Sequence, residues 1–184
     1  MKRTSVACIA LLALVGVTHA QTPKMPQPAP EVKRLEYFVG TWKAEYEIKP
    51  GPMGPGGKMS SVDQCRFMPG GFFLEIRTEG NGTIGVLKGL AVMGYDIAEK
   101  VYTYDAFNNL GEADHFKGSL QGDTWTWNSE SVVDGKPTRM RFTAREVSPT
   151  MYTMKFEMGT GSDWTAVMEG KATKKAAKKN TKTT

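Results

Sequence analysis

The chain has 184 residues, of which 40% are hydrophobic, so it is long enough for one domain with appendages. Its formal net charge of +5 comes from its two ends, where Lys2, Arg3 and six lysines of residues 171–184 hold the basic excess. Residues 21–170 carry 16 basic and 19 acidic side chains. This mildly acidic body argues against a basic nucleic-acid-binding face, and we expect no nucleic-acid partner.

Residues 1–20 predict a secretory signal peptide. A basic start at residues 1–3 precedes an apolar run over residues 6–17, and Ala20 supplies the small residue at which a signal peptidase cuts. The apolar run is shorter than the roughly 20 residues that span a bilayer, which disfavours an uncleaved membrane anchor. We therefore expect a periplasmic or secreted protein.

Cleavage after Ala20 leaves Cys65 and His115 as the only cysteine and histidine. A single cysteine forms no internal disulfide, so the domain depends on its hydrophobic core for stability. One histidine and one cysteine also fall short of a Cys/His zinc site. We predict no metal site and no cofactor.

Two segments are predicted to flank the folded domain, which we place at residues 31–170. Residues 21–30 hold four prolines and predict an extended linker. Residues 171–184 form a lysine-rich, low-complexity tail that we expect to be disordered. The tail is either a solvated end without a partner or a weak contact for an anionic surface.

The hydrophobic period changes on the two sides of Gly40. Before it, Leu35, Phe38 and Val39 are spaced i, i+3 and i+4, which predicts one face of a short helix. After it, apolar and polar residues alternate from Trp42 onward, which predicts a half-buried strand.

A short helix that turns through Gly-x-Trp into a first strand is typical of small calycin-type barrels, the group of the lipocalins and fatty-acid-binding proteins. In that arrangement the helix closes one barrel end, and Gly40 and Trp42 have structural roles. We expect a basic residue of a late strand to pack on Trp42 as a cation–π partner. The candidates are Arg139, Arg141 and Lys171.

Residues 49–58 contain four glycines and three prolines and predict no regular element. A lipocalin-like barrel often places a lid over its open end at this position. A surface insertion that is merely tolerated is an equal alternative.

The remainder of the domain alternates between apolar and polar residues in segments separated by turn signals. These segments are 59–67, 72–78, 86–95, 100–107, 112–120, 124–133, 138–147, 152–158 and 164–171. With the first strand they predict an all-β, up-and-down antiparallel barrel of about ten strands. Closure into a barrel is favoured over an open sheet because it removes two exposed strand edges.

Three stretches of the sequence together resemble a known protein family. They are Leu35 to Trp42, Gly94-Tyr95-Asp96 followed by Lys100, Tyr102, Tyr104-Asp105 and Gly111, and Glu146 to Thr150 followed by Tyr152, Lys155 to Met158 and Met168 to Thr173. In this order they resemble the bacterial domain of unknown function 1579 family. The resemblance covers nearly all of residues 31–173 and implies a calycin-like barrel in a bacterial envelope setting. It brings no activity and no catalytic residues.

Aromatic and methionine side chains share faces of the late strands. The predicted ligand-binding residues are Trp125, Trp127, Tyr152, Met154, Phe156, Trp164 and Met168. Aromatic rings bury large areas and methionine adapts its shape, so such a wall suits an apolar ligand cavity. The same side chains also suit a core that fills the barrel, and the sequence leaves both open.

His115 is the one candidate for an axial haem ligand or a catalytic base, beside the alternative of an exposed surface residue. Its neighbour Asp114 points to the opposite face of the strand and is a poor orienting partner. Glu75 and Arg77 share a face, either as an inward carboxylate site or as an exposed ion pair. No Gly-x-Ser-x-Gly element occurs, and we identify no catalytic residue.

The sequence therefore favours a monomeric, secreted barrel protein that binds a small hydrophobic or amphipathic molecule. One alternative is an envelope structural or interaction protein with a filled barrel. The other is a small-substrate enzyme or a haem binder that uses His115. Binding is favoured over catalysis because no catalytic constellation accompanies the barrel pattern.

Overall fold

The structure is a computed structural model that describes residues 25–83, 85–133, 135–159 and 162–176. The predicted signal peptide and most of the predicted lysine-rich tail lie outside these residues. In the described part of the chain, no helix is long and apolar enough to cross a membrane.

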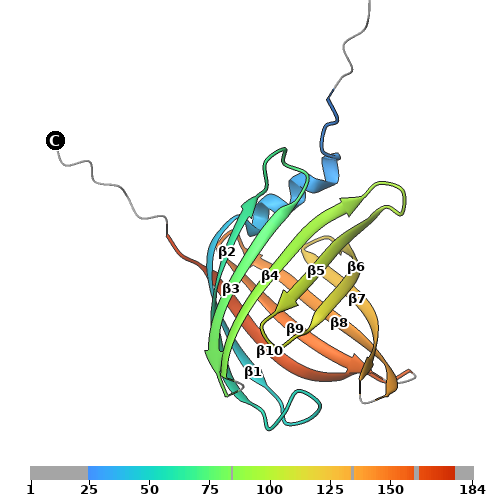
Figure 1. Ribbon diagram of the computed structural model, residues 1–184. Coiled ribbons are helices and arrows are strands. Elements are labelled where there is room, and N and C mark those ends of the chain that lie inside the picture. The colour runs from blue at the N-terminus through green and yellow to red at the C-terminus, as the bar shows by residue number, and fades with distance from the viewer. Residues whose placement is uncertain (1–24, 84, 134, 160–161, 177–184) are drawn as a thin grey trace, which may run out of the picture.

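Ten antiparallel strands close into one barrel (Figure 1). They are β1 (Gly40–Ile48), β2 (Gly57–Phe67), β3 (Leu74–Gly82), β4 (Gly85–Asp96), β5 (Val101–Asn108), β6 (Ala113–Gln121), β7 (Thr124–Val133), β8 (Lys136–Ser148), β9 (Met151–Gly159) and β10 (Thr165–Lys174). Each strand pairs with its neighbours in sequence, and β1 pairs with β10 to complete the ring. The predicted all-β, up-and-down barrel is confirmed.

Strand β10 continues to Lys174, four residues past the predicted domain boundary at 170. Lys171, Ala172 and Thr173 pair with β1 on one side and with β9 on the other. Ala172 is fully buried between the exposed Lys171 and Thr173, so the alternation of the strand persists into the lysine-rich segment. The start of that segment is therefore part of the barrel wall.

The predicted short helix is a 3-10 helix, η1, which spans Pro30–Phe38 and lies across one end of the barrel (Figure 1). Its buried residues are Val32, Leu35 and Phe38, at a spacing of three. A 3-10 helix has three residues per turn, so side chains at this spacing lie above one another. Val39 was predicted on the same face but follows the helix and is 36% exposed.

Hydrogen bonds fasten η1 to the end of the barrel that it covers. The Tyr37 hydroxyl lies 2.9 Å from the carbonyl oxygens of both Ser148 and Met151, in the β8–β9 connection. The Tyr102 hydroxyl donates to the Glu31 carbonyl at 3.1 Å. This end of the barrel, which we call the closed end, is therefore covered by the helix.

Trp42 is fully buried at the closed end, and its indole nitrogen donates to the Phe38 carbonyl at 2.7 Å. The basic residue over its ring is Lys174, with Nζ 4.8 Å from the ring centroid. Lys174 also donates to the Tyr37 carbonyl at 3.0 Å. The late strand therefore supplies the expected cation, but not from Arg139, Arg141 or Lys171, because β10 reaches Trp42 only at its last residue.

Candidate ligand-binding cavity

The barrel holds a cavity of about 620 Å³, to which all ten strands contribute side chains. This volume lies within the roughly 300–1,000 Å³ of small-molecule sites. Phe38 of η1 forms part of its inner end. The barrel is therefore not filled by its own side chains, which removes the basis of the filled-barrel alternative.

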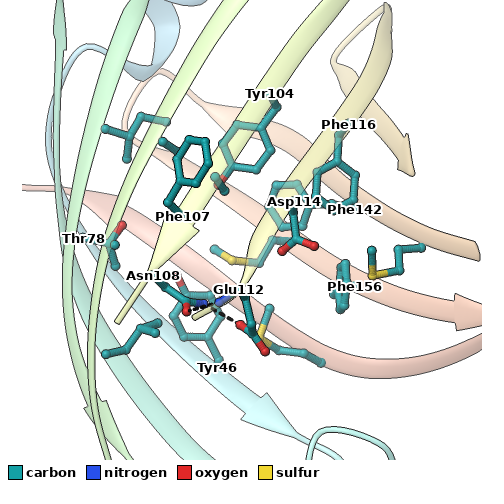
Figure 2. Close-up of a pocket in the computed structure, with 18 of the residues that line it drawn as sticks. Tyr46, Thr78, Tyr104, Phe107, Asn108, Glu112, Asp114, Phe116, Phe142 and Phe156 are labelled. Atoms are coloured by element: carbon teal, nitrogen blue, oxygen red, sulfur yellow. Dashed lines mark hydrogen bonds between the residues drawn. The ribbon is translucent and has the colours of Figure 1, made fainter. Parts of the chain in front are cut away.

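The cavity wall is mainly apolar and rich in methionine. Seven of the eleven methionines line it. These are Met53, Met59, Met93, Met140, Met154, Met158 and Met168. The aromatic rings of the wall include those of Phe116, Phe142 and Phe156 (Figure 2). Methionine side chains are flexible and polarisable, so this wall adapts to the shape of an apolar ligand.

Four of the seven residues predicted to bind ligand lie in this wall, namely Tyr152, Met154, Phe156 and Met168. The first three occupy alternate positions of β9, so they project to the inside together.

Trp125 and Trp127 face inward but are not among the residues that line the cavity. Both are fully buried, and their rings stack with centroids 5.5 Å apart. The Phe38 ring of the helix lies 5.3 Å from that of Trp125. The two tryptophans therefore belong to the core under the helix. Alternation gives the face of a strand residue but not its height along the barrel.

Trp164 lies outside the barrel, where the guanidinium groups of Arg139 and Arg141 stand 4.6 and 4.2 Å from its ring. The pairing of β10 with β9 shifts register between Ala166 and Met168. Such an irregularity reverses the facing of residues on its two sides. Trp164 and Met168 therefore point to opposite faces, although their spacing predicts a shared one.

The loop between β1 and β2 brings Pro52 and Met53 to the cavity wall. It lies at the end of the barrel opposite η1 (Figure 1). Gly51 and Gly54 hold its turn by two backbone hydrogen bonds of 2.9 Å. The loop is thus a part of the site rather than an insertion remote from it.

The most buried polar group of the cavity is Asp63, which is 7% exposed and projects inward from β2. The Ser61 hydroxyl donates to its Oδ1 at 3.2 Å, and the Tyr46 hydroxyl lies 3.2 Å from Ser61 Oγ. Burial raises the pKa of Asp63 above its usual range, although hydrogen bonds from Thr78 and Ser61 oppose this. Burial and the nearby charge of Asp63 also raise the pKa of Tyr46.

The hydroxyls of Tyr104 and Tyr152 belong to the same region. Burial raises the pKa of both, and the charge of Asp63 contributes, which places both rings within electrostatic range of that carboxyl. Neither hydroxyl makes a hydrogen bond to the described residues. Both therefore remain available as neutral donors to a bound molecule.

Two further carboxyl groups, those of Glu112 and Asp114, line the cavity at and beside the β5–β6 turn (Figure 2). Asn108 Nδ2 donates a hydrogen bond to Glu112 Oε2. Asp114 extends into the cavity from β6, and burial together with the charge of Glu112 raises its pKa. Among the described residues that line the cavity, none is lysine, arginine or histidine.

His115 lies on the outer face of β6, where its side chain is 69% exposed. Its Nδ1 is 2.8 Å from Asp105 Oδ1, while its neighbour Asp114 faces inward. The geometric basis for a haem ligand or a catalytic histidine inside the barrel is therefore absent. The Glu75–Arg77 pair also lies outside, and Arg66 shares the Glu75 carboxylate.

The remaining reactive group is Cys65, a buried free thiol at the cavity wall. Burial raises the pKa of Cys65 to about 12, so the thiol is protonated and a poor nucleophile at neutral pH. The described part of the chain holds no group of three or more His, Cys, Asp or Glu side chains placed to bind a metal ion. The arrangement suits non-covalent binding.

The sequence matches the family described as protein of unknown function (DUF1579) over residues 27–174. The chain belongs to the DUF1579 family. The predicted family is thus confirmed. No curated protein matches the chain in sequence.

Solved structures share the fold of this DUF1579 chain. The crystal structure of Rv2717c from M. tuberculosis aligns with a TM-score of 0.61 at 13% identity, over 82% of this chain and 100% of that one. The S-type phycobiliprotein lyase CPES from Guillardia theta aligns with a TM-score of 0.53 at 12% identity, over 79% and 93% of the two chains. At these identities the likeness concerns the barrel fold alone.

Proposed function

We propose that this DUF1579 protein binds a small hydrophobic or amphipathic molecule inside its barrel, and that it does so in the periplasm or outside the cell. The observation that carries the proposal is the cavity of about 620 Å³ with its methionine-rich and aromatic wall. Apolar cavities with a few convergent polar groups are the usual form of small-molecule sites. Here those polar groups are Asp63 and the surrounding hydroxyls.

The test is a titration of the purified protein with N-phenyl-1-naphthylamine, a neutral probe that fluoresces in apolar surroundings. We expect saturable binding with one site per chain. The substitution Ala106→Phe should weaken it at least tenfold, because Ala106 lines the cavity from β5 and a phenyl ring occupies the space of the probe.

The matched control is Ala98→Phe, which places the same ring in the exposed turn between β4 and β5. Its binding should equal that of the unmodified protein. Equal binding by the Ala106→Phe variant, or the absence of saturable binding in the unmodified protein, contradicts the proposal. Thermal unfolding of both variants shows whether they are folded.

A further inference from the structure

We propose that the cavity selects molecules with a cationic amine head group on an apolar body and rejects anionic amphiphiles such as fatty acids. This inference rests on the proposed function and names its ligand class. The observation behind it is Asp63, a carboxyl group buried at the cavity wall with only neutral hydrogen-bond partners.

Asp63 forms no ion pair within the described part of the chain, and its hydrogen-bond partners are the hydroxyls of Ser61 and Thr78. Its partners across the sheet are Trp42 on β1 and Thr78 on β3. Lys174 is directed to the closed end, where it contacts the Trp42 ring and the Tyr37 carbonyl. Burying a carboxylate without a cationic partner costs desolvation free energy. An ammonium group placed beside the carboxylate offsets that cost.

The surroundings of Asp63 suit an ammonium group in two further respects. The aromatic rings of Tyr46, Tyr104 and Tyr152 line the same cavity, and ring faces attract cations. Hydroxyl groups nearby accept the remaining ammonium hydrogens, since a hydroxyl is both donor and acceptor.

The rest of the cavity points to the same charge preference. Asp114 and Glu112 line the same cavity at and beside the β5–β6 turn, so the wall carries further acidic groups (Figure 2). A fatty acid carboxylate is held most strongly by a basic group, and no lysine, arginine or histidine occurs among the described lining residues. The tyrosine hydroxyls of the cavity are neutral donors, and they lie close to the Asp63 carboxyl, whose negative charge opposes a second anion. An anionic head group would therefore meet acidic side chains both at Asp63 and at the β5–β6 turn.

Three probes with one alkyl chain test this inference, namely dodecylamine, dodecanol and dodecanoate. Each competes with N-phenyl-1-naphthylamine at neutral pH and low salt, below its aggregation concentration. We expect dodecylamine to bind at least about tenfold more tightly than dodecanol, as a charge-assisted hydrogen bond does over a neutral one. Dodecanoate should bind about tenfold more weakly than dodecanol.

The outcomes separate the inference from the proposed function. If dodecanol displaces the probe and dodecylamine binds no more tightly, the cavity binds ligands and the charge selection is wrong. If dodecanoate binds as tightly as dodecylamine, the selection is also wrong. If no compound binds, and neither does the fluorescent probe, both proposals fail.

A substitution tests whether Asp63 causes the preference for a cationic head group. Asp63→Asn should reduce the ratio of dodecylamine affinity to dodecanol affinity to about threefold or less. The control Asp105→Asn removes a carboxylate from the outer face of β5 and should keep the full preference for dodecylamine. Retention of the full preference in Asp63→Asn overturns the inference. If that variant does not fold, Asp63→Ser, which repeats the side chain of Ser61, serves instead.

Discussion

Two carboxyl groups of this barrel are almost equally buried and have opposite surroundings. Glu157 is 6% exposed on the outer side of β9, and Asp63 is 7% exposed on the inner side of β2. Glu157 binds the Arg141 Nε and the Lys155 Nζ, each at 2.8 Å. Asp63 has hydroxyl partners only.

The pKa values reflect this difference. Desolvation alone would raise the pKa of Glu157, but the hydrogen bonds and charges of Arg141 and Lys155 outweigh it, and the pKa lies below its usual range. For Asp63 desolvation dominates, and the pKa is raised. The Glu157 carboxylate therefore has its cationic partners within the protein and stabilises the fold. The Asp63 carboxyl has no such partner, and a cationic ligand would supply one.

The largest stability effect is expected at the outer carboxyl. Glu157→Gln removes the acceptor of two cations and should lower the free energy of unfolding by about 2 kcal/mol. This is less than for a fully buried pair, because Arg141 and Lys155 are 30% and 42% exposed. Urea denaturation at neutral pH measures the change.

The pH dependence of that effect has a fixed sign. A carboxyl whose folded pKa is lowered contributes stability that is present above the unfolded pKa, here 4.5, and lost as the pH falls through the folded value. The difference in free energy of unfolding between the unmodified protein and Glu157→Gln should therefore be largest at neutral pH and become smaller in acid. An unchanged difference at low pH contradicts the ion-pair explanation.

Asp63→Asn should act in the opposite direction and raise the free energy of unfolding by about 1 kcal/mol at neutral pH, in the absence of ligand. The raised folded pKa means that the carboxyl is unfavourable above that pKa and neutral below the unfolded value of 3.8. The gain should vanish as the pH falls toward 3.8. Destabilisation at neutral pH would show that the carboxylate supports the fold.

The smallest effect is expected for Asp105→Asn, at the exposed pair with His115. Surface ion pairs contribute at most about 1 kcal/mol, so the change in free energy of unfolding should stay within about 0.5 kcal/mol. The same urea titration measures it. A larger loss would mean that exposed carboxylates on this barrel carry more stability than their solvation suggests.

Alternation and turn signals were sufficient to predict the barrel, because a period of two is a local property of each strand. They were not sufficient for position along the barrel axis. Trp125 and Trp127 face inward as expected but lie under the helix, and the register shift in β10 turns Trp164 outward. Height and bulges depend on the pairing of whole strands, which a single segment does not determine.

The polar side of the cavity was missed, although its signal was present. Met59, Ser61, Asp63 and Cys65 occupy alternate positions of β2 and are all buried. Asp63 is separated from Met59 and Cys65 by even numbers of positions, so in a strand its carboxyl points to the same inner face as these apolar side chains. The open volume itself depends on how side chains of all ten strands meet, and it is not visible in any one of them.

The pairing of Trp42 with Lys174 joins the first strand of the barrel to its last strand. The barrel therefore cannot close while a ribosome still holds the end of β10, since the seam between β1 and β10 joins the first strand to the last. Contacts between distant parts of a chain form slowly. Closure of the barrel is thus a late step of folding, which follows the synthesis of β10.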